Sequence, residues 1–348
     1  MNLPSTSLLI LIRDKFFNSL NHLMTKLQVI VVLVIIIAVL VVILIETVEF
    51  RRFRVLKRDD DSSVNYVMSS ARYVNRTKPS QTKQRVVVSL TSTPERVWKM
   101  RPALLSLLHQ THQADEIAVN LPYISSKGVH YELPDWLVSL SQSTQIAIHR
   151  NHEDVGPATK LIPTLKREAS QTMIVVVDDD IIYNSHTVAN LVKRYLELRE
   201  LDGHEHAVTN FGVEVDSELH VPLSNWGRVT SFLKAEHRTD ILQGFSGYLV
   251  TPRMFPPQVF DTFGRDYSED EPPAFFVDDV WFSGWLGHAG IPIMQLRTLK
   301  QLPLPNYGEM YQLPSLSNTS PSAYEYDHAT IQWFVKNTDF TVMAAARY

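Results

Sequence analysis

No cysteine occurs anywhere in this chain of 348 residues. Its absence excludes disulfide bonds and thiolate metal ligands, so any metal ion must be held by carboxylates, histidines or water. The net charge is only −4, which gives no indication of nucleic-acid binding. No internal repeat is apparent in the sequence. Hydrophobic residues make up 45% of the chain, enough for a sizeable core, and argue against general disorder.

One long apolar run stands near the N-terminus, from Val29 to Ile45, and its neighbours extend it to 29–48. This is close to the length of a helix that crosses a bilayer. The run starts late and no small-x-small cleavage site follows it, which argues against a cleaved signal peptide. We therefore predict a tail (1–28), a single transmembrane helix (29–48), a polar stem (49–84), a main domain (85–302) and a C-terminal extension (303–348) that could cover its active site.

Strand-like and helix-like segments alternate from residue 85 onward. The pattern predicts strands at 86–90, 116–121, 145–149 and 173–177, and helices at 97–108, 157–166 and 188–196. Such alternation is typical of an α/β fold with a mainly parallel, mixed sheet flanked by helices. Later segments are less regular, with strands predicted at 206–215, 240–251 and 290–296 and helices at 278–286 and 329–335.

The most informative motif is the acidic triplet Asp178–Asp180, which directly follows the apolar strand at 173–177. Adjacent carboxylates repel one another unless a cation offsets their charge. In an extended strand ending, Asp178 and Asp180 should point the same way. Hard oxygen ligands at the carboxyl edge of a sheet suit Mg²⁺ or Mn²⁺ bridging a diphosphate. A solvated acidic turn is the alternative interpretation.

Residues that suit a phosphate group occur at two other loops. In the segment 154–161, Gly156 allows close backbone approach and Lys160 offers a positive charge. An ordinary helix start with a solvated lysine remains the alternative. Thr91 and Arg96 follow the first strand, where they could meet a base or a phosphate. For Arg96, a charge on a surface helix remains equally open.

Two further segments carry small or acidic residues. The segment 243–247 contains Gly244, which is typical either of close ligand approach or of a β-bulge in a core strand. Asp278 and Asp279 open the helix predicted at 278–286, where capping and the helix dipole favour acids. Two adjacent acids are nevertheless more than one cap requires, which indicates a functional role beside the structural one.

Taken in their order along the chain, these segments resemble the nucleotide-sugar-dependent glycosyltransferases of the GT-A fold, close to the family-2-like group. The resemblance covers residues 85 to about 300 and rests on the segments 86–94, 119–123, 154–161, 178–180 and 278–281. It implies a Rossmann-like GT-A domain that moves a sugar from a nucleoside-diphosphate sugar to a hydroxyl of a glycan, protein or lipid. It also implies Mn²⁺ or Mg²⁺ as cofactor, and inversion at the reacting carbon.

The same resemblance assigns roles to the acidic residues. It implies that Asp178 faces the ribose or the metal ion, that Asp180 binds the metal, and that Asp179 supports the metal or contacts the sugar. Which two of the three carboxylates hold the ion remains open. Asp279 corresponds to the general base that deprotonates the acceptor hydroxyl, and Asp278 stands where the family usually has glutamate.

The remaining implied site residues lie around the donor. The resemblance puts Gly244 in the region of the donor sugar and the acceptor, and it puts four residues at the nucleotide: Thr91, Arg96, Asp154 and Lys160. His288 and His328 are left out of the metal set, because a lone histidine is more often a packing or surface residue.

Two other functions remain open. A membrane-tethered carbohydrate-binding or inactive transferase-like module would need no general base, so Asp278 and Asp279 discriminate against it. A dehalogenase-like phosphotransferase requires Asp-x-Asp-Gly-Thr/Val, whereas Ile181 and Ile182 follow the triplet here.

The orientation of the anchor is also open. More basic residues follow the apolar run than precede it, which favours a cytosolic main domain. The order of tail, anchor, stem and main domain instead favours a single-pass type II protein of the Golgi with its catalytic domain in the lumen. The sequence predicts no oligomeric state.

Overall fold

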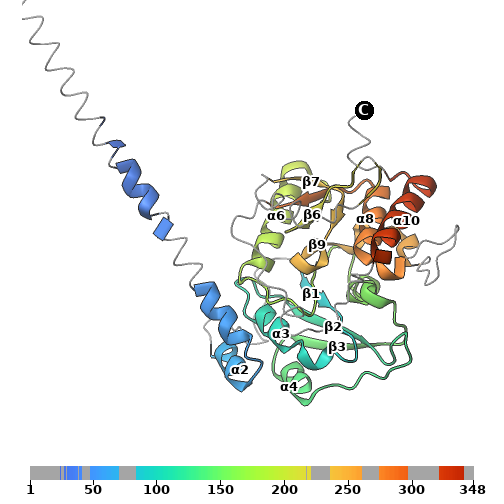
Figure 1. Cartoon of the computed structure of the whole chain (residues 1–348), viewed down its shortest axis with the longest axis horizontal. Coiled ribbons are helices and arrows are strands. Elements are labelled where there is room, and N and C mark those ends of the chain that lie inside the picture. Colours follow the sequence, from blue (N-terminus) through green and yellow to red (C-terminus); the bar gives the residue numbers. More distant parts are fainter. Residues whose placement is uncertain are drawn as a thin grey trace, which may run out of the picture. The chain divides into compact units, whose positions relative to one another are not determined.

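The computed structural model describes residues 48–69, 84–216, 218–220, 236–260, 274–296 and 321–340, together with 24, 27–28, 30–37 and 39–40 (Figure 1). The chain divides into two compact units, Met1–Arg54 and Val55–Tyr348.

In the first unit, the described residues near the predicted anchor are helical. Side chains from Ile30 to Ile37 are 48–59% exposed, although all are apolar. Within the described ranges, no helix is both long and apolar enough to cross a membrane. Residues 29, 38 and 41–47 of the predicted anchor lie outside those ranges, so the anchor stays a prediction.

The second unit is built around a mixed sheet of eight strands in the order β3-β2-β1-β4-β9-β5-β10-β7. Strands β1 to β4 are parallel, β9 is antiparallel to both β4 and β5, β10 is parallel to β5, and β7 is antiparallel to β10. The bounds are β1 (Val86–Leu90), β2 (Glu116–Pro122), β3 (Ile146–Asn151), β4 (Met173–Val176), β5 (Ala207–Thr209), β7 (His237–Thr239), β9 (Tyr248–Val250) and β10 (Ile293–Gln295). A two-stranded sheet pairs β6 (Gly212–Val213) with β8 (Ile241–Leu242).

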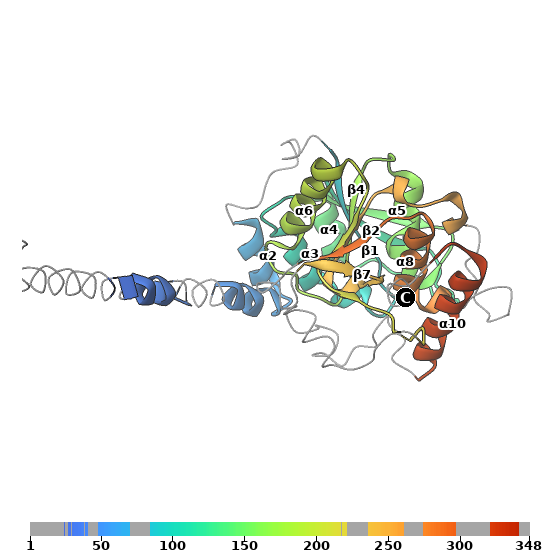
Figure 2. The same cartoon turned by 90° about the horizontal axis from the view of Figure 1, so that it is seen from above.

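The central strands are apolar because helices cover both faces of the sheet. Every residue of β1 and β4 is buried, as expected for parallel strands that see no solvent. Figure 2 shows α3 (Arg101–Leu108) and α6 (Thr187–Asp202) on one face, and α5 (Ile162–Arg167) and α8 (Asp278–His288) on the other. Because β1 to β4 are parallel, their carboxyl ends meet at one edge of the sheet.

Short helices lie in the loops of this unit. They are η1 (Val97–Lys99), η2 (Gly156–Lys160), η3 (Gly244–Ser246), η4 (Pro252–Met254), η5 (Pro257–Phe260) and η6 (Ala274–Phe276). One of them, η4, lies at the opposite edge of the sheet, where the N–H of Arg253 donates to the carbonyl of Ser170 before β4. The remaining longer helices are α2 (Asp61–Met68), α4 (Asp135–Ser143) and α10 (Pro321–Asn337).

The C-terminal helix α10 packs on α8 through aromatic side chains. Phe334 lies 5.3 Å from Trp281 and 5.4 Å from Trp285 between ring centroids. A side chain at Gly284 of α8 would collide with the ring of Phe334, so the close approach of the two helices requires glycine there. Part of the predicted C-terminal extension is thus joined to the helix that carries Asp278 and Asp279.

The predicted mainly parallel, mixed sheet flanked by helices is confirmed. Three local predictions differ from the structure. The strand predicted at 206–215 is two strands, β5 and β6, in different sheets, and the one predicted at 240–251 is divided into β8 and β9 by η3. The predicted stem at 49–84 contains α2, where Tyr66 makes a ring contact with His109 at 5.3 Å. Its helical character reflects the apolar residues Val64 and Val67 on a single face.

Candidate active site

Five aspartates and two basic residues, from distant parts of the chain, gather at the carboxyl edge of the central strands. Three of the acids follow β4, two open α8, and the cations come from the end of η2 and the start of η1. We call this set the aspartate cluster: Arg96, Lys160, Asp178, Asp179, Asp180, Asp278 and Asp279.

Lys160 forms the centre of one half of the cluster. Its Nζ lies 2.9 Å from Asp178 Oδ1, 3.0 Å from Asp278 Oδ2 and 3.6 Å from Asp279 Oδ1. The residue is only 5% exposed, so the alternative of a solvated lysine is wrong. Lys160 joins the end of β4 to the start of α8, and its predicted contact with phosphate stays a prediction.

Arg96 forms the centre of the other half. Its guanidinium pairs with Asp179, with Nε donating to Oδ2 over 3.2 Å, and lies 2.9 Å from Asp180 Oδ2. Ser92 Oγ donates a second hydrogen bond to Asp179 Oδ2 over 2.5 Å. Arg96 is 2% exposed, so the alternative of a surface helix charge is wrong.

The expectation that Asp178 and Asp180 point the same way is also wrong. Asp178 pairs with Lys160, whereas Asp180 pairs with Arg96. The strand β4 ends at Val176, and residues 179–180 form a turn. The alternation of side chains therefore stops before the triplet begins.

Buried polar side chains in the strands hold η2 in place. Ser89 Oγ of β1 donates to the backbone carbonyl of Lys160 over 2.5 Å, and Asn120 Nδ2 of β2 donates to Ser89 Oγ over 3.0 Å. Thr91 Oγ1 donates to the Asn120 carbonyl over 2.7 Å. Thr91 is 3% exposed, so its hydroxyl supports this network, and its predicted contact with a nucleotide stays a prediction.

Asp279 is oriented by the main chain of η3. Its Oδ2 accepts a hydrogen bond from the backbone N–H of Gly244 over 3.0 Å. Gly244 belongs to a short helix, so the alternative of a β-bulge is wrong. The N-cap of α8 is Val277, and no side chain from the described part of the chain caps this helix. Simple capping therefore does not explain the two acids.

The cluster holds five carboxylates but only two cations. The pKa values of four of these carboxylates are raised. Burial, together with the like charges of Asp178 and Asp179, raises the pKa of Asp180 to about 7, although Arg96 opposes this. Burial and the charges of Asp278 and Asp178 raise the pKa of Asp279 to about 7, although Lys160 opposes this. Burial also raises the pKa of Asp179 and of Asp278.

This surplus of oxygen donors is chemically suited to a divalent cation. Asp278 Oδ2 and Asp279 Oδ1 have no hydrogen-bond partner in the described part of the chain, although both approach Lys160. Hard oxygen atoms of this kind are the ligands that Mg²⁺ and Mn²⁺ prefer. No group of three or more acidic or histidine side chains among the described residues is already arranged as a metal site. The metal roles of Asp178 and Asp180 stay predictions.

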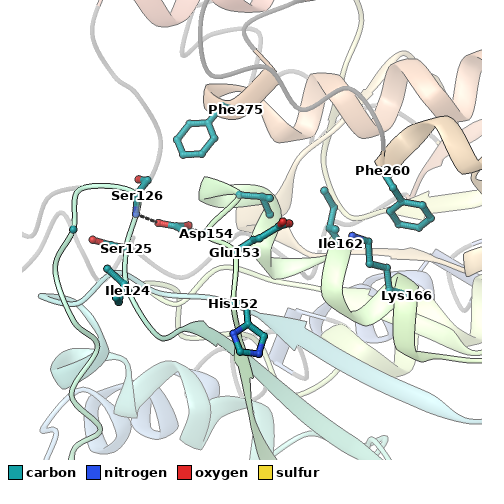
Figure 3. A pocket seen from close by; sticks show the side chains of 12 residues that line it. Ile124, Ser125, Ser126, His152, Glu153, Asp154, Ile162, Lys166, Phe260 and Phe275 are labelled. Atoms are coloured by element: carbon teal, nitrogen blue, oxygen red, sulfur yellow. Dashed lines mark hydrogen bonds between the residues drawn. The ribbon is translucent and has the colours of Figure 1, made fainter.

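Asp154 lies outside the aspartate cluster, on the wall of a neighbouring pocket of about 610 Å³ (Figure 3). Its Oδ1 accepts from the N–H of Gly156 over 2.9 Å, and its Oδ2 accepts from the N–H of Ser126 over 2.6 Å. Both bonds fix the loop between β3 and η2. Asp154 thus lies on the pocket wall and Lys160 lies in the aspartate cluster, although the two residues belong to one sequence motif.

Sequence reasoning missed Asp327 of α10. Burial and the charge of Asp278 raise the pKa of Asp327 to about 7, so the two carboxyl groups interact. Tyr326, its neighbour, stacks on Phe276 of η6 with ring centroids 5.1 Å apart. This helix carries aromatic and apolar residues at three- and four-residue spacing, a pattern that indicates a packed helix. No local pattern marked the carboxylate.

No family model matches the chain, and no curated protein matches it. Among solved structures, the chain is similar to GalNAc-T7, whose crystal structure contains UDP, GalNAc and Mn²⁺, with a TM-score of 0.41 and 11% sequence identity. The match covers 61% of this chain and 42% of that one, so less than half of GalNAc-T7 is matched.

Proposed function

We propose that the protein is a nucleotide-sugar-dependent glycosyltransferase of the GT-A fold, acting with inversion and with Mn²⁺ or Mg²⁺. One observation carries the proposal: Asp178 and Asp279, far apart in sequence, both approach the single buried ammonium group of Lys160. A metal-type acidic motif and a candidate base are thus held in one rigid group. The mostly parallel sheet agrees with the fold that the sequence resemblance implies.

In the proposed reaction, Asp279 accepts the proton of an acceptor hydroxyl. The hydroxyl oxygen forms a bond to the anomeric carbon of the donor sugar, while the bond from that carbon to the phosphate oxygen breaks. The nucleoside diphosphate leaves with the electron pair. Asp279 suits this role because burial raises its pKa to about 7, where a general base is most effective.

The other members of the cluster position these groups. The N–H of Gly244 orients the carboxylate of Asp279, and Lys160 holds Asp279 close to Asp178. Asp178 and Asp180, with Asp179 in support, would hold the divalent ion. When bound, the ion would neutralise charge on the departing diphosphate. Asp278 would support Asp279 through their common partner, Lys160.

Donor turnover by the full chain in detergent tests this function. We expect one UDP- or GDP-sugar to be hydrolysed slowly without acceptor and transferred with acceptor, in both cases only with Mn²⁺ or Mg²⁺. Asp279→Asn should lower transfer by about a hundredfold or more. Asp339→Asn, which changes an acid outside the cluster, is the matched control and should keep full turnover. Full activity of Asp279→Asn would show that another group is the base.

We also propose that residues 29–48 anchor the protein in a membrane as a type II protein with a lumenal catalytic domain. The described helical residues Ile30 to Ile37 support this, because an apolar helix exposed on all sides is suited to lipid. Protease protection of the main domain in sealed microsomes tests the orientation. Digestion of that domain without detergent would establish the opposite orientation, which the flanking basic residues favour.

A further inference from the structure

The pocket that contains Asp154 lies where the loops after β2 and β3 meet α5, η5 and η6. Its volume of about 610 Å³ is within the range of small-molecule sites. Figure 3 shows Phe275 on one side, Phe260 beside Lys166 on another, Glu153 between them and His152 below. No residue of the proposed reaction lines the pocket, although the sequence resemblance assigns one lining residue, Asp154, to the nucleotide.

Two short stretches of chain connect the pocket to the aspartate cluster. Val155 lines the pocket and is the N-cap of η2, which ends at Lys160 of the cluster. Phe275 of η6 lines the pocket shortly before Asp278. These segments pack tightly, because a Cβ on Gly156 would lie 2.9 Å from both the ring and the carbonyl of Phe275. The positive φ of Gly156, 64°, also favours glycine here. A ligand in the pocket would therefore border the proposed reaction centre.

The walls combine flat apolar surfaces with groups that bind hydroxyls. Phe275, Phe260 and Ile162 supply the apolar surfaces. Glu153 is exposed and forms no hydrogen bond or ion pair with any residue that the structure describes, so its carboxylate is available to accept from a ligand. The hydroxyl of Ser126 lies on the same wall. Aromatic faces beside carboxylate and hydroxyl groups match the apolar faces and hydroxyl edges of a sugar ring.

The charges of the pocket disfavour an anionic ligand. Two carboxylates, Glu153 and Asp154, line it beside one lysine, Lys166. That lysine already lies over the ring of Phe260, at 5.3 Å from its centroid. A diphosphate would be repelled unless a metal ion accompanied it, and the surplus of acids that could hold such an ion lies in the aspartate cluster. A neutral, hydroxyl-rich ligand is the better fit.

We infer that this pocket binds a sugar unit of the acceptor, and hence that the acceptor is an oligosaccharide rather than a peptide or a lipid alone. The inference rests on the proposed glycosyltransferase function. The pocket would hold a unit distant from the reacting hydroxyl, because Asp279 lies in the neighbouring cluster. Acceptors of three or more sugars should therefore bind better than monosaccharides.

Direct binding tests the pocket independently of catalysis. Saturation-transfer NMR on the full chain in detergent would use neutral trisaccharides of glucose, mannose and N-acetylglucosamine, with uridine and guanosine as competitors. We expect at least one trisaccharide to bind, and neither nucleoside to displace it. Glu153→Gln should weaken that binding about tenfold, because it loses a charged acceptor of hydrogen bonds. Glu132→Gln, an exposed acid outside the pocket, is the control and should bind normally.

Three results would overturn the inference: no saccharide binding, displacement by a nucleoside, or unchanged binding in Glu153→Gln. Kinetics then relate the pocket to the reaction. With saturating donor, Glu153→Gln should raise the KM for the oligosaccharide about tenfold and leave kcat within twofold. If no donor is turned over but saccharides bind at Glu153, the glycosyltransferase proposal fails and the saccharide site remains. If donors are transferred to peptides with an unchanged KM in Glu153→Gln, only the pocket inference fails.

Discussion

The backbone N–H of Gly244 donates a hydrogen bond to Asp279 Oδ2 over 3.0 Å. A Cβ on Gly244 would lie 2.5 Å from Lys160 Nζ and 3.3 Å from Asp279 Oδ1. A side chain at residue 244 would therefore displace the ammonium group of Lys160 from its place between the carboxylates. The hydrogen bond connects the middle of the chain to the start of α8 and fixes the direction of the proposed base.

Gly244→Ala should lower kcat for sugar transfer at least tenfold, because the new methyl group displaces Lys160 and turns Asp279 away from its productive direction. Initial rates at saturating donor and acceptor measure this. Gly203→Ala is the control, since Gly203 has a positive φ of 75° but no atom of a described residue within 4 Å of its Cβ position. It should lower the melting temperature and leave kcat unchanged. Equal kcat in Gly244→Ala and the wild type would contradict the positioning role.

Lys160→Met should lower the free energy of unfolding by about 3 kcal/mol, because it leaves three carboxylates without their common counter-ion. Urea denaturation at pH 7 without metal measures the loss. Lys193→Met is the control: the Lys193 side chain is 76% exposed and, among the residues that the structure describes, pairs with Glu197 alone. That change should cost no more than about 0.5 kcal/mol. Similar losses in both variants would mean that the buried ion contacts contribute little.

Mn²⁺ should raise the melting temperature of the full chain, because a divalent cation offsets the surplus negative charge of the aspartate cluster. At a hundredfold excess over the Kd, the stabilisation should be about 2.7 kcal/mol. Asp180→Asn should lose most of this effect, whereas the surface variant Asp202→Asn should retain it. Thermal denaturation with and without chelator, together with the electron paramagnetic resonance of bound Mn²⁺, provides the measurement. An unchanged Mn²⁺ response in Asp180→Asn would remove this residue from the metal set.

Glu116 should make stability depend on pH in the acid range. Burial alone would raise its pKa, but hydrogen bonds with His149 (2.7 Å) and Arg85 (2.6 Å) lower it from 4.5 to about 2. Since the folded pKa lies below the unfolded value, this stabilisation is complete above about pH 4.5 and is lost as the pH falls towards 2.

Glu116→Gln should therefore be less stable than the wild type by about 2 kcal/mol at pH 6, and the difference should shrink between pH 4.5 and 2. Urea denaturation at a series of pH values measures it. Glu132→Gln, which changes an exposed acid, should follow the wild type throughout. A difference for Glu116→Gln that stays constant down to pH 2 would rule out the carboxylate as the cause.

The central sheet was predictable because its strands are buried on both faces and are therefore continuously apolar, as in 86–90 and 173–177. The position of Asp178–Asp180 at a ligand-binding edge followed from this pattern. The pairing of β9 between β4 and β5 was not predictable, because short antiparallel strands leave little periodic signal. The division of the segment 206–215 between two sheets was not predictable for the same reason.

Within the site, residue types were easier to predict than partners. Lys160 and Arg96 were expected to meet a ligand, but the structure pairs them with aspartates of the chain. Those partners come from segments that only the tertiary fold brings together, as Asp278 does for Lys160. The turn at 179–180 likewise separates Asp178 from Asp180 in a way that strand alternation cannot indicate.

The packing of α10 on α8 has a consequence for biosynthesis. The ribosome synthesises α10 after α8, yet Phe334 of α10 fills the space that Gly284 leaves open beside the helix carrying Asp278 and Asp279. Until that segment emerges, Trp281 lacks its contacts with Trp333 and Phe334, so a nascent or prematurely terminated chain would expose part of this apolar face to chaperones and proteases. Quality control of the newly made protein would thus depend on α10.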